Sequence, residues 1–445
     1  MLRNFLLTFL LSVMLFGFAF GEKKYIPYNP SPSDNETIVP INGEVTLSWD
    51  ISNPYNKTIS YLLEIEDGDG KKSYRLKENH FKLAVSPGKI YRWKVTTIVY
   101  DKTYPGQFWN FTVPLQISSS FGTAGWDYFT TLEYAEKDIF RIVIKSLEPY
   151  KKSFRVIRIT SAGEELGETT LEATNFEVLA MSGDRFFGAI YDESVYLPAM
   201  IKDGLVNILT DKKYSLLKEP KPLGNNTFLI LGKTQDGTPV LQKLNLTGSS
   251  TSSIIKLPPL EPETLSFKND LTVVAGFIKK DSEILPAVTV LKGYKITRYL
   301  ELPMIGRFTD AFVTKNGIYL LGEIDSPFDQ DNDLLLVKLD PMGHLLWKIS
   351  IDNDGDDIAG DIKVFGDNVI VTGSVYRDKD YDVYLFKTDL DGKSRYVYYT
   401  DSDTDEFASE LYIGTLGYHI FGWKNTPGKK SDVFMRFIYK GALGK

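Results

Sequence analysis

The chain has 445 residues, of which 43% are hydrophobic and 24% are charged, so it can bury a sizeable core and does not have the composition of a disordered chain. Its net charge of −7, without a concentrated basic segment, argues against nucleic acid as a partner, because that binding requires a basic face. The absence of cysteine excludes disulfides, thiol nucleophiles and zinc–thiolate sites.

The first 21 residues have the pattern of a secretory signal peptide. Arg3 provides a positive charge, residues 5–18 form an apolar run, and Ala19 and Gly21 are small residues at the positions that precede a cleavage site. We therefore expect a secreted, periplasmic or cell-surface protein with no membrane span after cleavage. The alternative is an uncleaved anchor, although the run is shorter than the ~20 residues that span a bilayer.

Residues 22–36 are expected to form an extended linker, because Pro27, Pro30 and Pro32 stand among polar residues. Residues 37–113 then alternate apolar and polar residues in short segments that are separated by turn signals. The expected strands are Val45–Trp49, Ser60–Glu66, Ser73–Leu76, Phe81–Val85, Tyr91–Tyr100 and Phe108–Val113.

Aromatic residues at particular positions indicate that residues 37–113 fold as a β-sandwich. Trp49 lies on an early strand, and Tyr91 follows Leu83 and a Pro-Gly turn, where a tyrosine corner ties a crossover loop to a strand. With residues 109–113 (W-N-F-T-V) closing it, the segment resembles the fibronectin type III family. This resemblance implies a fold and no activity.

Residues 115–445 repeat a unit of four strands. Two series of glycines recur in phase, one following each expected third strand and one ending an apolar triplet. The first series is Gly163, Gly204, Gly248, Gly293, Gly343, Gly392 and Gly441, and the second is Gly188, Gly232, Gly276, Gly322, Gly373 and Gly422. We expect positive φ in tight hairpins at the first series, and a bulge or a close backbone approach at the second. Seven copies of a four-strand unit predict a seven-bladed β-propeller in an all-β chain.

The last repeat lacks a fourth strand. In the fifth repeat the expected strands are Ala311–Thr314, Ile318–Ile324, Asp333–Leu339 and Leu345–Ile351. Only four residues follow Gly441 in the seventh. We expect residues 115–121 to supply the missing strand and to close blade seven, because an open propeller would expose two sheet edges.

The fifth and sixth repeats share a longer pattern. Residues 333–348 read D-L-L-L-V-K-L-D-P-M-G-H-L-L-W-K, residues 352–362 read D-N-D-G-D-D-I-A-G-D-I, and residues 369–374 read V-I-V-T-G-S. This pattern resembles the β-propeller repeat family of bacterial surface and secreted proteins. The resemblance implies a fold and a location but no catalytic residues.

Alternating aspartates crowd the loops of the fifth and sixth repeats. Residues 325–406 hold twenty acidic and eight basic residues, a net charge of −12. Four D-x-D-x-D triplets should open on one face of the propeller, where their oxygens could bind Ca²⁺ as the only cofactor. The alternative is that aspartate simply suits turns and solvated loops. The candidate ligands are Asp329, Asp331, Asp333, Asp352, Asp354, Asp356, Asp378, Asp380, Asp382, Asp401, Asp403 and Asp405.

Other residues that carry chemistry do not form a recognisable catalytic motif. The three histidines, His80, His344 and His419, are not expected to converge, which argues against a zinc site or a histidine-based triad. The sequence contains no G-x-S-x-G, phosphate-binding loop or H-E-x-x-H motif. Catalytic residues are therefore not assigned.

Two functions are compatible with these patterns. The first is an exported, non-catalytic binding or scaffold protein whose propeller face recognises a polysaccharide or a protein. The alternative is a carbohydrate-active enzyme, a glycoside hydrolase or lyase, that uses paired carboxylates near the propeller channel. The aromatic residues Trp126, Tyr376, Tyr381 and Trp423 could stack on sugars in either case, or could instead fill gaps between blades.

Overall fold

The structure is a computed structural model that describes residues 24–443 except for short internal gaps. The gaps are residues 39, 41–42, 137–138, 149–150, 172–174, 193, 225–226, 246–252, 327–330 and 427–429. The predicted signal peptide lies outside the described residues. Within the described part of the chain, no helix has the length and apolarity needed to cross a membrane. The chain divides into two compact units, residues 1–115 and residues 116–445.

The first unit consists of two sheets that enclose one core. The first sheet has the order β1-β3-β6 and comprises β1 (Tyr28–Ser31), β3 (Glu44–Asp50) and β6 (His80–Ala84). The second has the order β2-β8-β7-β4-β5 and comprises β2 (Glu36–Thr37), β8 (Lys102–Val113), β7 (Lys89–Val99), β4 (Ile59–Asp67) and β5 (Gly70–Leu76). Strict alternation in β3 points Leu47 and Trp49 inward, where Trp49 packs on Trp93. The Tyr91 hydroxyl accepts a hydrogen bond from the Ser86 N–H (2.7 Å), as a tyrosine corner requires.

The expected linker over residues 22–36 contains strands. β1 pairs with β3, and β2 pairs in parallel with β8, so this segment belongs to both sheets. Prolines among polar residues are typical of a linker. Pro30 is nevertheless compatible with β1, because β1 is an edge strand and its outer side needs no ladder hydrogen bonds.

The second unit is built from four-stranded antiparallel groups. The first two groups are β10 (Trp126–Glu136), β11 (Ile139–Glu148), β12 (Lys151–Thr160), β13 (Glu165–Leu171), and β14 (Phe176–Ser182), β15 (Arg185–Asp192), β16 (Val195–Lys202), β17 (Leu205–Ile208). The next two are β18 (Tyr214–Gly224), β19 (Thr227–Thr234), β20 (Pro239–Asn245), β21 (Ser253–Lys256), and β22 (Glu261–Lys268), β23 (Leu271–Lys280), β24 (Glu283–Lys292), β25 (Lys295–Glu301). The next two are β26 (Gly306–Thr314), β27 (Gly317–Asp325), β28 (Asn332–Leu339), β29 (Leu345–Ile351), and β30 (Asp357–Phe365), β31 (Asn368–Arg377), β32 (Asp380–Asp389), β33 (Arg395–Tyr399). The last comprises β34 (Glu406–Ile413), β35 (Gly417–Lys424), β36 (Asp432–Tyr439) and β9 (Gln116–Phe121), and the short 3₁₀ helix η1 (Lys440–Leu443) follows it.

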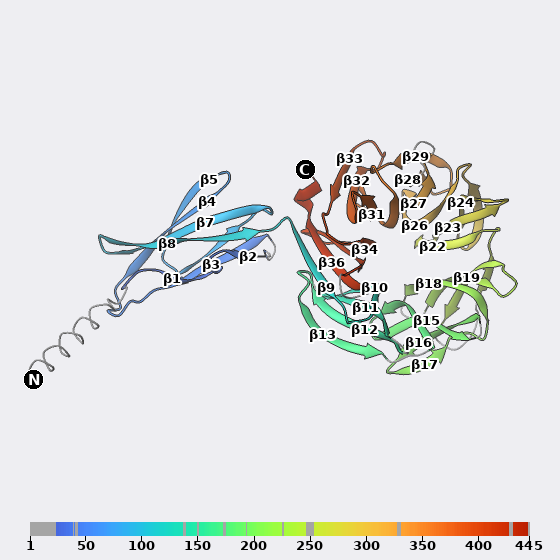
Figure 1. Cartoon of the computed structure of the whole chain (residues 1–445), viewed down its shortest axis with the longest axis horizontal. Helices are drawn as coiled ribbons and strands as arrows, with labels where there is room; N and C mark the ends of the chain where they lie inside the picture. The colour runs from blue at the N-terminus through green and yellow to red at the C-terminus, as the bar shows by residue number, and fades with distance from the viewer. Residues whose placement is uncertain are drawn as a thin grey trace, which may run out of the picture. The chain divides into compact units, whose positions relative to one another are not determined.

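These groups surround a common centre in the manner of a β-propeller (Figure 1). The first strands of successive groups lie against one another, whereas fourth strands such as β17 and β25 are largely exposed. Second and third strands are continuous apolar runs, as β23 and β28 show, because both of their faces are covered. The second and third groups are joined into one sheet by a single pair, Tyr196 with Tyr214.

β9 precedes the first group in sequence but pairs with the last strand of the last group. Its register joins Phe121 to Val433 and Gln116 to Ile438. β9 lies within residues 115–121, which were expected to pair at this edge. Phe121 is buried there in a core cluster with Phe421, Val433 and Met435.

The second series of glycines marks bulges and close approaches at once. At each glycine of this series, the facing first strand carries a break in register, for example between Phe308 and Asp310 opposite Gly322. A Cβ on Gly322 would overlap the carbonyl oxygen of Arg307 on that strand. The bulged strand therefore presses against its neighbour at a point where no side chain fits.

The first series behaves as predicted except at its end. Gly343 and Gly392, for example, have φ of +86° and +72° in tight turns between third and fourth strands. Gly248 lies outside the described residues. Gly441 does not have positive φ, because it lies in the 3₁₀ helix η1 that follows β36.

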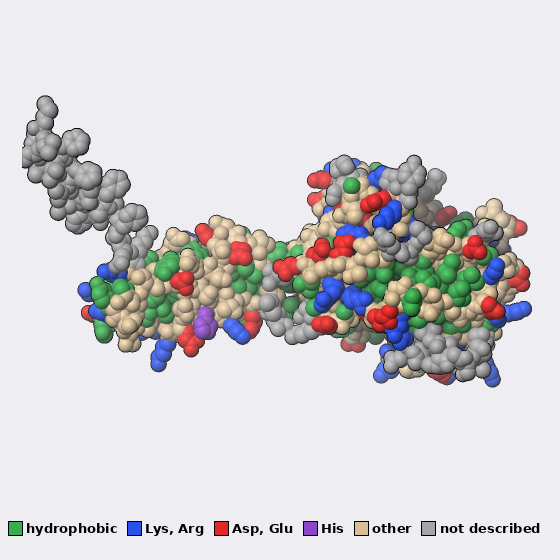
Figure 2. Space-filling model, turned by 90° about the horizontal axis from the view of Figure 1, so that it is seen from below, with side chains coloured by type: hydrophobic (Ala, Val, Ile, Leu, Met, Phe, Trp, Pro, Cys, Tyr) green, Lys and Arg blue, Asp and Glu red, His purple; other side chains and the backbone are tan. Residues whose placement is uncertain are grey.

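Charged side chains of both signs are interspersed with apolar ones over the side of the molecule drawn in Figure 2. This view therefore contains no continuous basic surface of the kind that nucleic-acid binding requires.

Candidate functional site

The acidic loops open on one face of the second unit, where second strands connect to third strands and fourth strands to the next first strand. We call this the loop face. Two of the aspartates there hold neighbouring loops together. Asp356 accepts hydrogen bonds from the N–H of Asn332 (3.1 Å) and from the Tyr381 hydroxyl (2.9 Å). In the equivalent position, Asp405 accepts hydrogen bonds from the N–H of Tyr381 (3.1 Å) and from Asn425 Nδ2 (3.0 Å).

Two further predicted aspartates lie where third strands begin. Asp333 and Asp382 are buried near the starts of β28 and β32, and Asp432 is buried at the start of β36. Asp382 accepts a hydrogen bond from the N–H of Ser402 (3.0 Å), and Asp432 accepts one from the Thr426 hydroxyl (3.1 Å). Burial, together with the charges of Asp380 and Asp401, raises the pKa of Asp382 to about 6. A buried aspartate therefore recurs near the start of three third strands, which fits a structural role in fixing the loops.

The remaining predicted ligands do not converge on a common point in the described residues. Asp352 accepts the N–H of Asp354 (2.7 Å), and Asp403 pairs with Lys379 (3.4 Å). Asp329 lies outside the described residues. Within the described ranges, no group of three or more acidic or histidine side chains is arranged to hold a metal ion. Calcium binding by these loops remains a prediction, and the hydrogen bonds above fit the turn interpretation.

The four aromatic residues singled out in the sequence belong to one continuous row. Tyr128 and Phe407 complete it, and we call these six residues the aromatic row. Ring centroids lie 6.2 Å apart for Trp126 and Tyr128, 5.5 Å for Tyr128 and Trp423, and 4.3 Å for Trp423 and Phe407. The row continues from Phe407 to Tyr381 at 5.1 Å and from Tyr381 to Tyr376 at 5.3 Å.

The aromatic row lies on the loop face because of where its members stand on their strands. Trp126 and Phe407 begin first strands, whereas Tyr376 and Trp423 lie near the ends of second strands. The row crosses three neighbouring groups, those of β10, β34 and β30. Trp126 and Tyr376 at its two ends are 38% and 44% exposed, and the other four rings are partly buried. Large aromatic side chains are therefore exposed at both ends of the row, and the four rings between them are partly exposed.

Polar groups flank the aromatic row. The hydroxyl of Tyr381 donates to Asp356, and burial together with this contact raises the pKa of Tyr381 to about 12. At the other end, Lys430 Nζ lies 5.8 Å from the centroid of the Trp126 ring. The row thus combines aromatic faces with carboxylate and ammonium groups.

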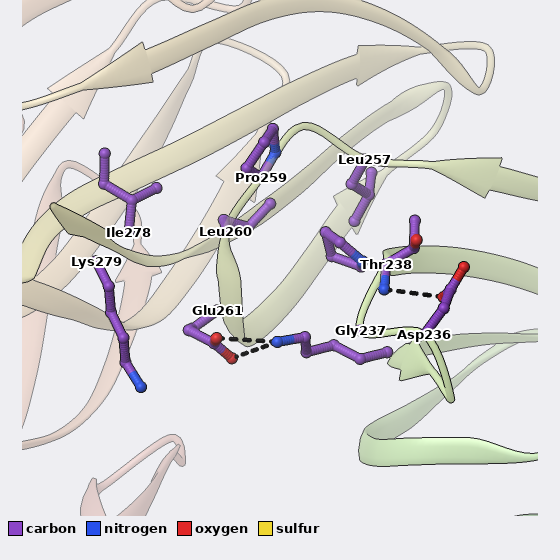
Figure 3. A pocket seen from close by; sticks show the side chains of 11 residues that line it. Asp236, Gly237, Thr238, Leu257, Pro259, Leu260, Glu261, Ile278 and Lys279 are labelled. Atoms are coloured by element: carbon purple, nitrogen blue, oxygen red, sulfur yellow. Dashed lines mark hydrogen bonds and ion pairs between the residues drawn. The ribbon is translucent and has the colours of Figure 1, made fainter.

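A separate hollow of about 450 Å³ opens on the loop face between the groups of β18 and β22 (Figure 3). Its walls include Leu257, Pro259 and Leu260, and Lys233 makes an ion pair with Glu261 (2.9 Å) at one side. The apolar side chains of this hollow are mostly buried in the core beneath it. It does not contain any residue of the aromatic row.

Sequence reasoning missed a chain of polar contacts at the centre of the unit. Thr264 Oγ1 donates to Asp310 (3.1 Å), the N–H of Ile362 donates to Asp310 (3.0 Å), and the N–H of Leu411 donates to Asp361 (2.7 Å). Each contact joins the first strand of one group to the first strand of another. These first strands are edge strands with no ladder partner on their other side, and a side chain from another group accepts the N–H groups of Ile362 and Leu411 there.

Asp310 and Asp361 also interact with each other and with Lys363. Lys363 Nζ lies 2.6 Å from Asp361. Burial and the Asp310 charge hold the pKa of Asp361 well above its ordinary value, against the opposing charge of Lys363. Burial acts in the same direction on Asp310, but the hydrogen bond from Asp361 and the nearby charge of Lys363 outweigh it and lower the pKa of Asp310. The two carboxyls and Lys363 therefore form one buried cluster at the centre of the unit.

A sequence signal for these central residues exists. Thr264, Asp310, Asp361 and Glu410 each stand twelve residues before a glycine of the second series. The position is therefore predictable from the bulge that faces that glycine. The residue types differ between these positions, however, so a search for a repeated residue does not find them.

The histidines lie in separate places. His80 is in the first unit beside Glu78 (3.1 Å), and His344 contacts Asp340 (2.8 Å) in the turn between β28 and β29. His419 is buried in β35, where its ring nitrogen contacts the Ser161 carbonyl (3.0 Å) and burial lowers its pKa to about 4.

Comparisons with known proteins give no family. No family model matches the chain, and no curated protein matches it. Among solved structures, the β-propeller domain of the trilobed protease from Pyrococcus furiosus is 11% identical with a TM-score of 0.47, over 72% of this chain and 95% of that one. The phage phi92 endosialidase is 8% identical with a TM-score of 0.43, over 75% and 71%. The lignostilbene dioxygenase from Pseudomonas brassicacearum is 9% identical with a TM-score of 0.46, over 73% and 92%. At these identities and scores, the matches carry no argument about activity.

Proposed function

We propose that this chain is an exported, non-catalytic binding protein that holds a glycan on the aromatic row. The row of six rings across three groups of strands is the observation that carries the proposal. Export rests on the signal pattern in residues 1–21.

We further infer that the second unit is a seven-bladed propeller, with β9 as the fourth strand of blade seven. The four-stranded groups and the two glycine series support this count. The first unit would be a fibronectin type III-like sandwich, which the Tyr91 contact and the core around Trp49 support. In this proposal the sandwich is a spacer or a second contact.

A glycan suits the aromatic row for chemical reasons. The faces of sugar rings are apolar, whereas their edges carry hydroxyl groups. Aromatic faces can pack on the first, and carboxylate or amide groups such as Asp405 and Asn425 can hydrogen-bond the second. A row of rings favours a polymer over a single sugar.

Substitution of the exposed ends of the row tests this function. Trp126→Ala and Tyr376→Ala are each expected to weaken binding to an oligosaccharide, because each lost ring contact contributes about 0.5–1.5 kcal/mol, roughly two- to tenfold in affinity. Isothermal titration calorimetry on candidate oligosaccharides found by a glycan array would measure the change.

Tyr396→Ala is the matched control for this test. Tyr396 is 42% exposed, close to the 44% of Tyr376, and lies in the same group of strands but on the outer strand β33. Equal losses from Tyr396→Ala and Tyr376→Ala would contradict a role for the row.

The alternative, a carbohydrate-active enzyme, depends on paired carboxyls. Glycoside hydrolases place two carboxyls about 5 to 9.5 Å apart with the substrate between them. Asp310 and Asp361 instead interact with each other and with backbone groups of neighbouring strands, which favours the binding function. Release of reducing sugar ends by the protein, lost in Asp361→Asn, would replace the proposal with the enzyme.

A further inference from the structure

We infer that the glycan held by the aromatic row carries protonated amines, so that it is an amino-sugar polymer. This inference rests on the proposed function and adds the chemical class of the ligand. It is drawn from the charges that surround the row and from the cations that already stack on rings nearby.

Three acidic loops surround the end of the row formed by Phe407, Tyr381 and Tyr376. Residues 352–356 reach Tyr381 through Asp356, residues 377–380 connect Tyr376 to Tyr381, and residues 401–405 are separated from Phe407 by Glu406 alone. Several of these carboxylates are exposed rather than used inside the fold. The exposed ones are Asp352, Asp354, Asp378, Asp401 and Asp403, of which Asp352 accepts the Asp354 N–H.

The basic residues near this end do not cancel that charge. Lys379 is paired with Asp403, whose side chain is 97% exposed, and the Arg377 guanidinium lies over the Tyr399 ring at 4.2 Å. Lys430 stands at the other end of the row, over Trp126, and Lys424 stands in the middle of the row, next to Trp423 and opposite Glu406. The surface beside Tyr376 and Tyr381 is therefore negative.

The rings of this region already receive cations from the chain itself. Lys430 Nζ lies 5.8 Å from the Trp126 centroid, and Arg377 covers Tyr399, whose hydroxyl contacts Asn353 (3.0 Å) in one of the acidic loops. An aromatic face beside a carboxylate attracts a cation by both its quadrupole and the neighbouring charge. A protonated amine on a sugar would satisfy both attractions along the row.

The same charges select against other glycans. A uronic acid or sulfated polymer would bring negative groups against the exposed aspartates, and like charges at close range are repelled. A neutral glycan would keep the stacking and lose the charge attraction. The expected order of affinity is therefore amino sugar, neutral sugar, acidic sugar.

The test uses the full chain and three oligomers of matched length: glucosamine, N-acetylglucosamine and a uronic acid. We expect the glucosamine oligomer to bind roughly tenfold more tightly than its N-acetylated form, and its binding to weaken as salt is raised from 0.05 to 0.5 M. The uronic acid oligomer is expected not to bind.

Charge-removing variants assign the effect to the loop face. The variant D354N/D378N/D401N/D403N should weaken glucosamine binding roughly five- to tenfold and leave N-acetylglucosamine binding unchanged. The control D203N/D270N/D367N/D391N removes the same charge from exposed turns on the opposite face and should change neither. All substituted side chains are exposed, so the variants are expected to fold.

The outcomes separate this inference from the proposed function. Equal affinity for the amino and N-acetylated oligomers, with both lost in Trp126→Ala, would overturn the inference and leave glycan binding standing. Equal losses from the two charge variants would also overturn it. No binding of any oligomer, with tight binding of polylysine that requires Tyr376, would overturn the glycan function and this inference together.

Discussion

The carboxyls of Asp357 and Glu406 occupy equivalent positions at the starts of β30 and β34, yet only one has a cation. Glu406 is 1% exposed and pairs with Arg436 Nε at 3.0 Å. Asp357 is also 1% exposed, and it accepts a hydrogen bond from Asn353 Nδ2 (2.7 Å) at one oxygen only. Burial raises the pKa of Asp357 to about 8, against its ordinary 3.8, so it holds a proton at neutral pH.

Asp357 should make the stability of the second unit depend on pH. Because its pKa is higher in the folded chain, its contribution is intact below about pH 4 and is lost as pH rises towards 8. Asp357→Asn should remove this dependence and raise stability at pH 8 by a few kcal/mol, since each pKa unit is about 1.4 kcal/mol. Calorimetric melting between pH 4.5 and pH 8 measures it.

The control is Asp367→Asn, which changes an exposed acid in the turn between β30 and β31. An unchanged pH dependence in Asp357→Asn, or an equal change in Asp367→Asn, would contradict the assignment to Asp357.

Neutralising Glu406 should have the opposite effect on stability to neutralising Asp357. Glu406→Gln leaves the Arg436 guanidinium buried without its counter-charge, and removing one partner of a buried pair costs about 3–5 kcal/mol. We expect this variant to lower the melting temperature of the second unit at pH 7, where Asp357→Asn raises it. A rise in both variants would show that the Arg436 ion pair is not stabilising.

At the scale of strands, the spacing of the glycines predicted the repeats because these glycines are required by the backbone geometry. A bulge that presses on the neighbouring strand leaves no room for a Cβ there. Glycine therefore recurs at this position in the repeats, as at Gly322 and Gly373. The central contacts were not predicted, since Thr264, Asp310 and Glu410 share a position and not a side chain. A hydrogen-bond acceptor is needed there, and several residue types can supply one.

The aromatic row itself was not predicted, for a related reason. Trp126, Tyr376, Tyr381 and Trp423 were singled out from the sequence by type. Tyr128 and Phe407 join them through contacts between separate groups of strands, and single-chain periodicity carries no information about such contacts. β1 was missed because proline on an edge strand resembles proline in a linker.

The bulge glycines give a prediction about β26 and β27. Gly322→Ala should destabilise the second unit by about 1–3 kcal/mol, because the added methyl group overlaps the Arg307 carbonyl and strands must separate. Gly441→Ala is the control, since a Cβ there meets open space and φ is not positive. Equal melting temperatures for the two variants would mean that the strands at the bulge can separate without loss of stability.

The acidic loops give a second prediction at this scale. Asp356, Asp382 and Asp405 already accept backbone N–H groups, so we expect millimolar Ca²⁺ to leave the melting temperature of the second unit unchanged. A site filled at 100 times its dissociation constant would instead raise stability by about 2.7 kcal/mol. Such a rise, lost in Asp354→Asn, would establish the calcium interpretation.

For the whole second unit, the pairing of β9 with β36 connects its beginning to its end. Phe121→Ala should lower the stability of this unit by about 3 kcal/mol, because its ring fills a core that includes Phe421 and Met435. Leu166→Ala, on the exposed strand β13, is the control, as Leu166 is 48% exposed. If Phe121→Ala melts no lower than Leu166→Ala, β9 contributes little to holding the unit together.

The pairing of β9 with β36 also determines the order in which the strands can pair during synthesis. β9 leaves the ribosome more than 300 residues before β36, its partner, whereas each other group of strands is contiguous in the chain. Domains fold as their segments emerge, so those groups can assemble early while β9 waits with an unpaired edge. Until β36 emerges, that waiting strand is the part of this unit most in need of protection from a neighbouring chain.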